Sequence, residues 1–194
     1  MGLKSRRMNG DVMNTQPSRN PISHVDPDGL LEYSVVFTDR SLNHMSQSFQ
    51  TVMRDIDSIL TGVYNAATTV LVPGGGSFGM EAVARQFATG KNVKVVRNGW
   101  FSYRWTQIFD AGNIPASVDV MMASRTSEDT RAPYAPAPIE NVVAAILADK
   151  PDVVFAPHVE TSAGVILPDS YITAMAEAVH EVGGIMVLDC VASG

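Results

Sequence analysis

The sequence has few of the features that mark secreted, membrane-spanning or nucleic-acid-binding proteins. It contains one cysteine in 194 residues, which excludes an internal disulfide and fits a reducing compartment. No apolar run approaches the roughly 20 residues of a membrane span. Lys4, Arg6 and Arg7 are not followed by the apolar stretch of a secretory signal. The net charge is −6, whereas a nucleic-acid binder needs a basic face. We therefore expect a cytoplasmic protein with no membrane or nucleic-acid partner.

The distribution of polar and apolar residues predicts one α/β domain behind a polar arm. Residues 1–27 are rich in Asn, Ser, Arg and Pro and lack periodicity, so we expect a mobile arm there. From residue 28 to residue 194, short apolar segments alternate with amphipathic ones, which indicates a three-layer domain with a mainly parallel sheet. Strands are expected at 69–72, 93–96, 118–122, 152–156 and 185–188, and helices at 45–63, 79–88, 101–111, 139–148 and 171–182. The proline-rich stretch 125–138 is expected to be a loop.

Three consecutive glycines, Gly74–Gly76, are the most informative local feature. They follow the apolar run Thr69–Val72 and precede Ser77 and a helical pattern, which predicts a buried strand, a glycine loop and a helix start. The first N–H groups of a helix have no partner within it, and an anion such as phosphate is their usual ligand. The alternative is a tight turn that binds nothing.

The stretch Gly74–Gly79 also matches G-x-G-x-x-G, the pattern of dinucleotide-binding proteins. That pattern requires an acidic residue about twenty positions further on, at the end of the next strand, to bind a ribose. Here the next predicted strand ends in Arg97 and Asn98, and no carboxylate is present there. The hypothesis of a nicotinamide-dependent oxidoreductase is therefore supported by the glycine pattern alone.

Polar side chains follow three further predicted strands, in segments 98–101, 158–162 and 189–193. Because ligands bind at the carboxyl ends of parallel strands, these segments and the glycine loop are expected to line one crevice. Asp189 follows four apolar residues, so its carboxylate needs a strong partner. Two partners are open: a protonated ring nitrogen of a ligand, or the backbone amides of Ala192 and Ser193.

One of these segments offers two hydroxyl groups and an imidazole–carboxylate pair. Thr161 and Ser162 can donate hydrogen bonds to a ligand oxygen. His158 and Glu160 could be two ligands of a metal ion, but no third ligand lies at a useful spacing. We therefore expect His158 and Glu160 to make structural hydrogen bonds, and we predict no metal site.

Together these features describe a site for pyridoxal 5′-phosphate: a phosphate loop, the aromatic pair Trp100–Phe101, hydroxyl donors and a carboxylate for a ring nitrogen. Three stretches make the likeness specific: Pro73–Ala84 (PGGGSFGMEAVA), His158–Val165 (HVETSAGV) and Leu188–Gly194 (LDCVASG). On these residues the sequence resembles the class V aminotransferases of fold type I, in particular the alanine–glyoxylate and serine–pyruvate aminotransferase group. The resemblance extends from about Leu31 to Gly194.

The resemblance implies a role for each of seven residues. Gly75, Gly76 and Ser77 would bind the cofactor phosphate, Phe101 would stack on the pyridine ring, and Val191 would pack on its opposite face. Thr161 would hydrogen-bond the ring hydroxyl or a nearby cofactor oxygen. Asp189 would pair with the protonated pyridine nitrogen and so make the ring a better electron sink. Gly75 stands where relatives commonly have serine, so its missing hydroxyl is expected to weaken the phosphate contact modestly.

The resemblance also implies parts that lie beyond Gly194 in relatives: the lysine that forms the Schiff base with the cofactor, the arginine that binds the substrate carboxylate, and segments of the second subunit of a homodimer. We therefore expect the N-terminal part of a transaminase, incomplete at its C-terminus and inactive alone. Its substrates would be a small amino acid such as alanine or serine and a 2-oxo acid such as glyoxylate or pyruvate. The alternatives are a truncated, non-catalytic relative that acts in cofactor binding or dimerisation and, within the same fold, a cysteine desulfurase or a lyase.

Overall fold

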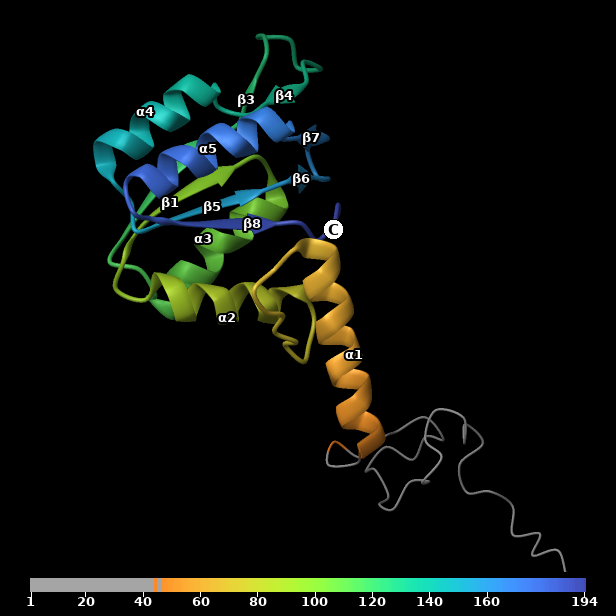
Figure 1. The fold of residues 1–194 in the computed structure, drawn as a ribbon. Coiled ribbons are helices and arrows are strands. Elements are labelled where there is room, and N and C mark those ends of the chain that lie inside the picture. The colour runs from red at the N-terminus through yellow and green to blue at the C-terminus, as the bar shows by residue number, and fades with distance from the viewer. Residues whose placement is uncertain (1–43, 45–46) are drawn as a thin grey trace, which may run out of the picture. The chain divides into compact units, whose positions relative to one another are not determined.

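The computed structural model describes residue 44 and residues 47–194. The chain divides into two compact units, one up to Leu71 and one from Val72 to Gly194, and each is described here by itself. The first unit contains α1 (Gln47–Tyr64), which confirms the helix predicted at 45–63 (Figure 1). Ile59 and Val63 on its predicted apolar face are more than half exposed. The predicted arm at 1–27 lies outside the described residues.

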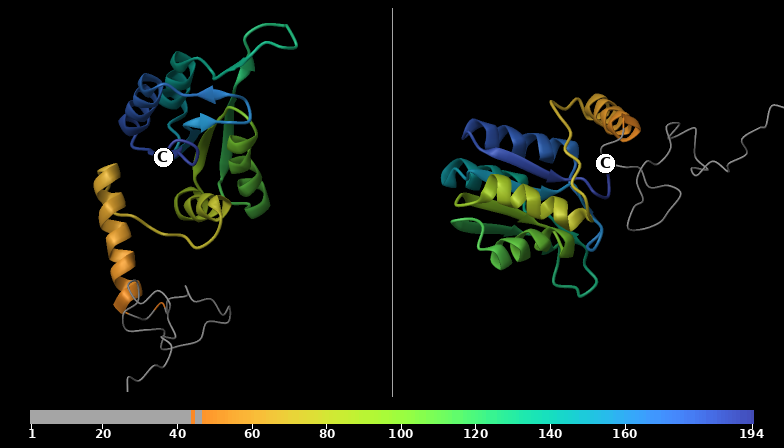
Figure 2. Two further views of the ribbon diagram at one scale, coloured as in Figure 1. Left: turned by 90° about the vertical axis from the view of Figure 1, so that its right-hand side faces the viewer. Right: turned by 90° about the horizontal axis from the view of Figure 1, so that it is seen from below.

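The second unit is a parallel sheet with helices on both faces. The sheet consists of β2 (Ser117–Met122), β1 (Asn92–Arg97), β5 (Val153–Pro157) and β8 (Ile185–Asp189), in that spatial order. The helices are α2 (Gly76–Ala88), α3 (Trp100–Gly112), α4 (Ile139–Asp149) and α5 (Asp169–Glu181). Helices α2 and α3 cover one face, and α4 and α5 cover the other (Figures 1 and 2). The predicted three-layer α/β architecture with a parallel sheet is confirmed.

The two-residue period of the central strands explains why the sheet has a core on each face. Val93 and Val95 of β1 point to the same side as Phe155 and pack with α2 and α3. Val96 and Val154 point to the other side, into the core formed with α4 and α5. All five of these side chains are at most 2% exposed, so burial on both faces fixes the register of β1 against β5.

Lys94 is the exception in this apolar pattern. Its side chain is 1% exposed, and its ammonium group donates hydrogen bonds to Asp119 and, at 2.9 Å, to Asp149. Burial lowers the pKa of Lys94, but the hydrogen bonds and charges of the two carboxylates outweigh burial and raise it. The lysine therefore stays charged and connects β1 to the neighbouring strand β2 and to the end of α4.

Two sequence-based predictions of local structure were wrong. Residues 69–72 form no strand, and Val70 is 77% exposed. A strand requires backbone hydrogen bonds to a neighbouring strand, and no described strand pairs with this segment. The stretch 125–138 is not purely a loop, because β3 (Ser124–Arg125) and β4 (Tyr134–Ala135) form a short antiparallel hairpin. A second hairpin, β6 (Val159–Glu160) with β7 (Val165–Ile166), was not predicted.

Of the helices that the structure describes, none has both the length and the apolar character that a membrane crossing requires.

Candidate functional site

The glycine loop presents an open backbone at the N-terminus of α2. Gly74 has φ of +134°, and a Cβ there would lie 2.8 Å from the Phe78 ring, so this position needs glycine. By contrast, a Cβ on Gly75 or Gly76 would meet no atom within 4 Å. The N–H of Phe78 bonds to the Gly75 carbonyl at 2.9 Å. Within the described residues, no backbone carbonyl takes the N–H groups of Gly76 and Ser77. These two N–H groups and the exposed Ser77 hydroxyl are therefore open to an anion.

Arg104 joins the glycine loop to the first turn of α3. Its Nη1 donates to the Ser77 hydroxyl oxygen at 3.1 Å, and its guanidinium carbon lies 5.6 Å from the centroid of the Phe101 ring. Phe101 is 39% exposed, so part of this residue remains accessible to a ligand. Sequence reasoning missed Arg104. The available signal was its position three residues after Phe101, which places both on one face of a helix.

Glu160 holds the N-terminus of α3 in place. Its side chain is completely buried, and its carboxylate accepts hydrogen bonds from the Phe101 amide at 3.1 Å, the Ser102 amide at 2.8 Å and the Ser102 hydroxyl at 2.7 Å. The Ser162 hydroxyl donates to the same carboxylate at 2.5 Å and accepts from the Trp100 amide at 2.8 Å. The expectation of a hydrogen-bonding role for Glu160 is confirmed. This network fixes Phe101 relative to the turn that carries Thr161.

The Glu160 network makes stability depend on pH. Burial raises the pKa of Glu160, but hydrogen bonds from Ser162, Ser102 and Phe101 outweigh burial and lower it. A carboxyl group whose pKa is lower in the folded state stabilises the fold above its unfolded pKa, and this contribution is lost as the pH falls through the folded pKa. We expect the free energy of unfolding to drop below about pH 4.5, the ordinary value of the group. Urea denaturation between pH 7 and pH 3 should show a shallower decline for Glu160→Gln, which does not titrate. Equal declines would contradict the assignment.

Gly99 is the position where this network tolerates no side chain. A Cβ at Gly99 would lie 2.5 Å from Ser162 Oγ and 2.7 Å from Glu160 Cγ. We expect Gly99→Ala to cost about 1–3 kcal/mol in the free energy of unfolding, as overpacking does elsewhere. Gly62→Ala is a control without overpacking, because a Cβ at Gly62 would meet no atom within 4 Å, and alanine inside α1 should leave the stability unchanged or raise it by up to about 1 kcal/mol. Urea denaturation of both variants measures the difference, and equal stabilities would show that the turn relaxes freely.

The ends of β5 and β8 bring a second group of predicted residues together. Asp189 is half-buried, and its Oδ1 accepts a hydrogen bond from the Val191 amide at 3.1 Å. That is one residue earlier than the amides considered in the sequence analysis. The His158 amide donates to the Asp189 carbonyl at 2.9 Å, and His158 Nδ1 lies 2.8 Å from Ser193 Oγ. Val191 itself is 80% exposed.

The predicted site residues therefore fall into two groups at the carboxyl edge of the sheet, and contacts connect the members within each group. Ser77 contacts Phe101 through Arg104, and Phe101 is tied through Glu160 to the turn that holds Thr161. Asp189 and Val191 lie at the end of β8, hydrogen-bonded to the end of β5. Thr161 is exposed in the turn that follows Glu160. Gly75 and Gly76 precede Ser77 at the open end of α2. One expectation was wrong, because the glycine loop does not follow a strand.

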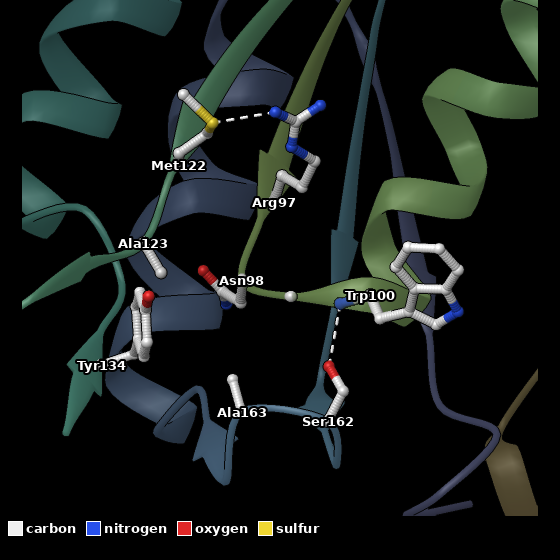
Figure 3. Close-up of a pocket in the computed structure, with 9 residues that line it drawn as sticks. Arg97, Asn98, Trp100, Met122, Ala123, Tyr134, Ser162 and Ala163 are labelled. Carbon is white, nitrogen blue, oxygen red and sulfur yellow. Dashed lines mark hydrogen bonds between the residues drawn. The ribbon is translucent and has the colours of Figure 1, made fainter. Parts of the chain in front are cut away.

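A pocket of about 380 Å³ is lined by the Asn98–Trp100 turn (Figure 3). Its walls include Met122, Tyr134 and Ala163, but none of the residues predicted to bind a cofactor. The Asn98 carboxamide has no hydrogen-bond partner among the described residues, and both of its polar atoms are closed off from solvent. Along the described part of the chain, no three His, Cys, Asp or Glu side chains gather in a way that could hold a metal ion.

Comparison with known proteins finds aminotransferases, although no family model matches the chain. The chain is 35% identical over 133 residues to a 2-aminoethylphosphonate–pyruvate transaminase of Lactiplantibacillus plantarum, a match covering 65% of this chain and 32% of that protein. An alanine–glyoxylate aminotransferase of Nostoc sp. superposes with a TM-score of 0.61 at 23% identity, covering 78% of this chain and 38% of that one. A pyridoxamine–pyruvate aminotransferase of Mesorhizobium loti gives 0.63 at 18% identity, covering 79% and 37%.

These matches confirm the resemblance to aminotransferases that the three sequence stretches predicted, and the solved structures show the shared fold. The chain spans about a third of the length of the relatives it matches.

Proposed function

We propose that this chain is the cofactor-binding part of a pyridoxal-phosphate-dependent aminotransferase. One observation carries the proposal: Arg104 contacts both Ser77 at the open N-terminus of α2 and the partly exposed Phe101. Asp189, the last residue of β8, lies half-buried at the same edge of the sheet. The relatives named above support it, because each is called an aminotransferase or a transaminase.

The donor set fits pyridoxal phosphate. The N–H groups at Gly76 and Ser77, with the Ser77 hydroxyl and open space at Gly75, suit a phosphate group. The exposed part of Phe101 suits stacking on the pyridine ring of the cofactor, and the exposed Val191 would pack on the other face of that pyridine ring. The Thr161 hydroxyl would serve the ring hydroxyl. Asp189 keeps one carboxylate oxygen free of protein donors among the described residues, and this oxygen would accept from a protonated ring nitrogen. When bound, the cofactor supplies the electron sink that amino-group transfer needs.

The proposed reaction moves an amino group between a small amino acid, such as alanine or serine, and a 2-oxo acid, such as pyruvate or glyoxylate. The acceptors named in the relatives support this substrate class. We propose a homodimer in which the lysine and substrate-binding arginine lie outside these 194 residues. Dinucleotide binding has lost support, because that fingerprint requires a strand before the glycines and residues 69–72 form none.

Two measurements test the proposal. Isothermal titration of the chain with pyridoxamine 5′-phosphate should show saturable binding with one site. This ligand is chosen because it has no aldehyde and cannot react with the lysines of the chain. The protein that carries the chain should convert alanine and glyoxylate to pyruvate and glycine when pyridoxal phosphate is added. Absence of both binding and cofactor-dependent turnover would refute the proposed function. Binding without turnover in that protein would favour the non-catalytic alternative.

A further inference from the structure

We propose that Arg104 supplies the positive charge that pairs with the cofactor phosphate. The inference rests on the proposed function and adds a residue that neither the sequence analysis nor the resemblance assigned. A phosphate monoester carries close to two negative charges near neutral pH, since its second pKa is about 6. The glycine loop offers only neutral N–H groups and one hydroxyl, so the site needs a cation.

Arg104 lies between the two groups that would hold the cofactor. Its guanidinium is within hydrogen-bond distance of Ser77 Oγ, at 3.1 Å, and it lies over the Phe101 ring at 5.6 Å. A ligand with its phosphate on Ser77 and its ring on Phe101 would therefore lie beside the guanidinium. Among the described residues, no other basic side chain makes a hydrogen bond to Ser77 or a cation–π contact with Phe101.

The charge of Arg104 is not used within the described structure. No carboxylate among the described residues pairs with it, whereas Arg85, on α2, is held by Glu81 at 2.7 Å. The Ser77 hydroxyl oxygen and the Phe101 ring are neutral partners, and they leave most of the five guanidinium donors for an anion.

The hydrogen bond between Arg104 and Ser77 also orients the hydroxyl. Arginine has no acceptor, so Ser77 Oγ must accept from Nη1. The hydroxyl hydrogen then has to point away from the guanidinium, and it is free to donate to a phosphate oxygen. Arg104 and Ser77 would thus act together on one phosphate group.

The test compares two ligands that differ only in the phosphate. Isothermal titration of the 194-residue chain with pyridoxamine 5′-phosphate and with pyridoxamine separates the phosphate contact from stacking on Phe101. We expect Arg104→Gln to weaken binding of the phosphorylated ligand about tenfold or more, as for loss of a hydrogen bond between charged groups. Binding of pyridoxamine should be unchanged, and Arg104→Lys should recover part of the loss because it restores the charge without the planar fork.

Arg85→Gln is the matched control, since it removes an arginine from α2 whose charge is already paired. This variant should bind both ligands like the parent chain. The dissociation constant of inorganic phosphate, measured by competition with pyridoxamine 5′-phosphate, should be at least tenfold higher for Arg104→Gln than for the parent chain.

Three results would overturn the inference. Equal weakening of both ligands in Arg104→Gln would mean that Arg104 only packs against Phe101. Unchanged affinity for the phosphorylated ligand would mean that the guanidinium does not meet the phosphate. If the parent chain binds neither ligand, the role of Arg104 fails, whereas the proposed function fails only if cofactor-dependent turnover is absent as well.

Discussion

Replacing Glu160 by alanine should lower the free energy of unfolding by about 4 kcal/mol, because several donors would lose their shared acceptor and each buried unsatisfied group costs about 1–3 kcal/mol. The carboxylate is fully buried and accepts hydrogen bonds from the Phe101 amide and from both the amide and the hydroxyl of Ser102. Alanine would leave these donors without a partner in the interior, where each unsatisfied group is costly. Urea denaturation at pH 7, monitored by circular dichroism, measures the loss.

Glu177→Ala is the control for Glu160→Ala, because Glu177 lies exposed on α5 and its side chain makes no hydrogen bond among the described residues. Its effect should stay within about 0.5 kcal/mol, as for most surface substitutions. Glu160→Gln should fall between the two, since it retains the shape but replaces one acceptor oxygen with a donor facing other donors. A loss of under about 1 kcal/mol for Glu160→Ala would show that water or a shifted helix start satisfies the freed amides.

Replacing Asp189 by alanine should weaken binding of pyridoxamine 5′-phosphate about 30-fold or more, since truncating one partner of a buried, hydrogen-bonded charge pair costs about 2 kcal/mol or more. The carboxylate is half-buried at the end of β8, where water screens its charge only in part. Isothermal titration of the variant chain measures the change. In the protein that carries this chain, the same substitution should also cripple turnover, because the protonated ring nitrogen would lose its partner.

Asp189→Asn separates charge from shape in this experiment. Asparagine retains an acceptor for the Val191 amide, which now bonds to Asp189 Oδ1 at 3.1 Å, but it has no negative charge. If charge pairing with the ring nitrogen is the role of Asp189, the Asn and Ala variants should lose similar affinity. Parent-like affinity in Asp189→Asn would instead assign Asp189 to capping the segment that follows β8, the other alternative raised by the sequence.

The sequence predicted the parallel sheet because its central strands are buried on both faces. The run Val93–Val96, with a lysine inside it, and the apolar run that forms β5 can be recognised without long-range information. The ends of α2 and α3 were also readable, because Gly90 and Asn113, which follow them, adopt positive φ, which glycine and asparagine favour.

The failures have a different physical origin. Residues 69–72 have the composition of a strand, but a strand exists only with a partner, and composition does not reveal one. The hairpins β3–β4 and β6–β7 have strands of two residues, too short to produce a periodic pattern. The spacing of Arg104 and Phe101 was readable within α3, but the contact of Arg104 with Ser77 depends on where α2 lies relative to α3, which no local pattern contains.

The Glu160 network has a consequence for which anions this sheet edge can accept. The two helices that carry the proposed phosphate and ring contacts, α2 and α3, begin at this edge, and both present amide groups with partial positive charge. At α3 the first three amides are already bonded by the side chains of Glu160 and Ser162. The protein thus carries an internal substitute for an anion at α3, and of these two helices α2 is the one whose first amides are open to a phosphate from outside. A ligand with a single terminal phosphate suits this arrangement, whereas a ligand with two well-separated phosphates would find its second position occupied by a carboxylate of like charge.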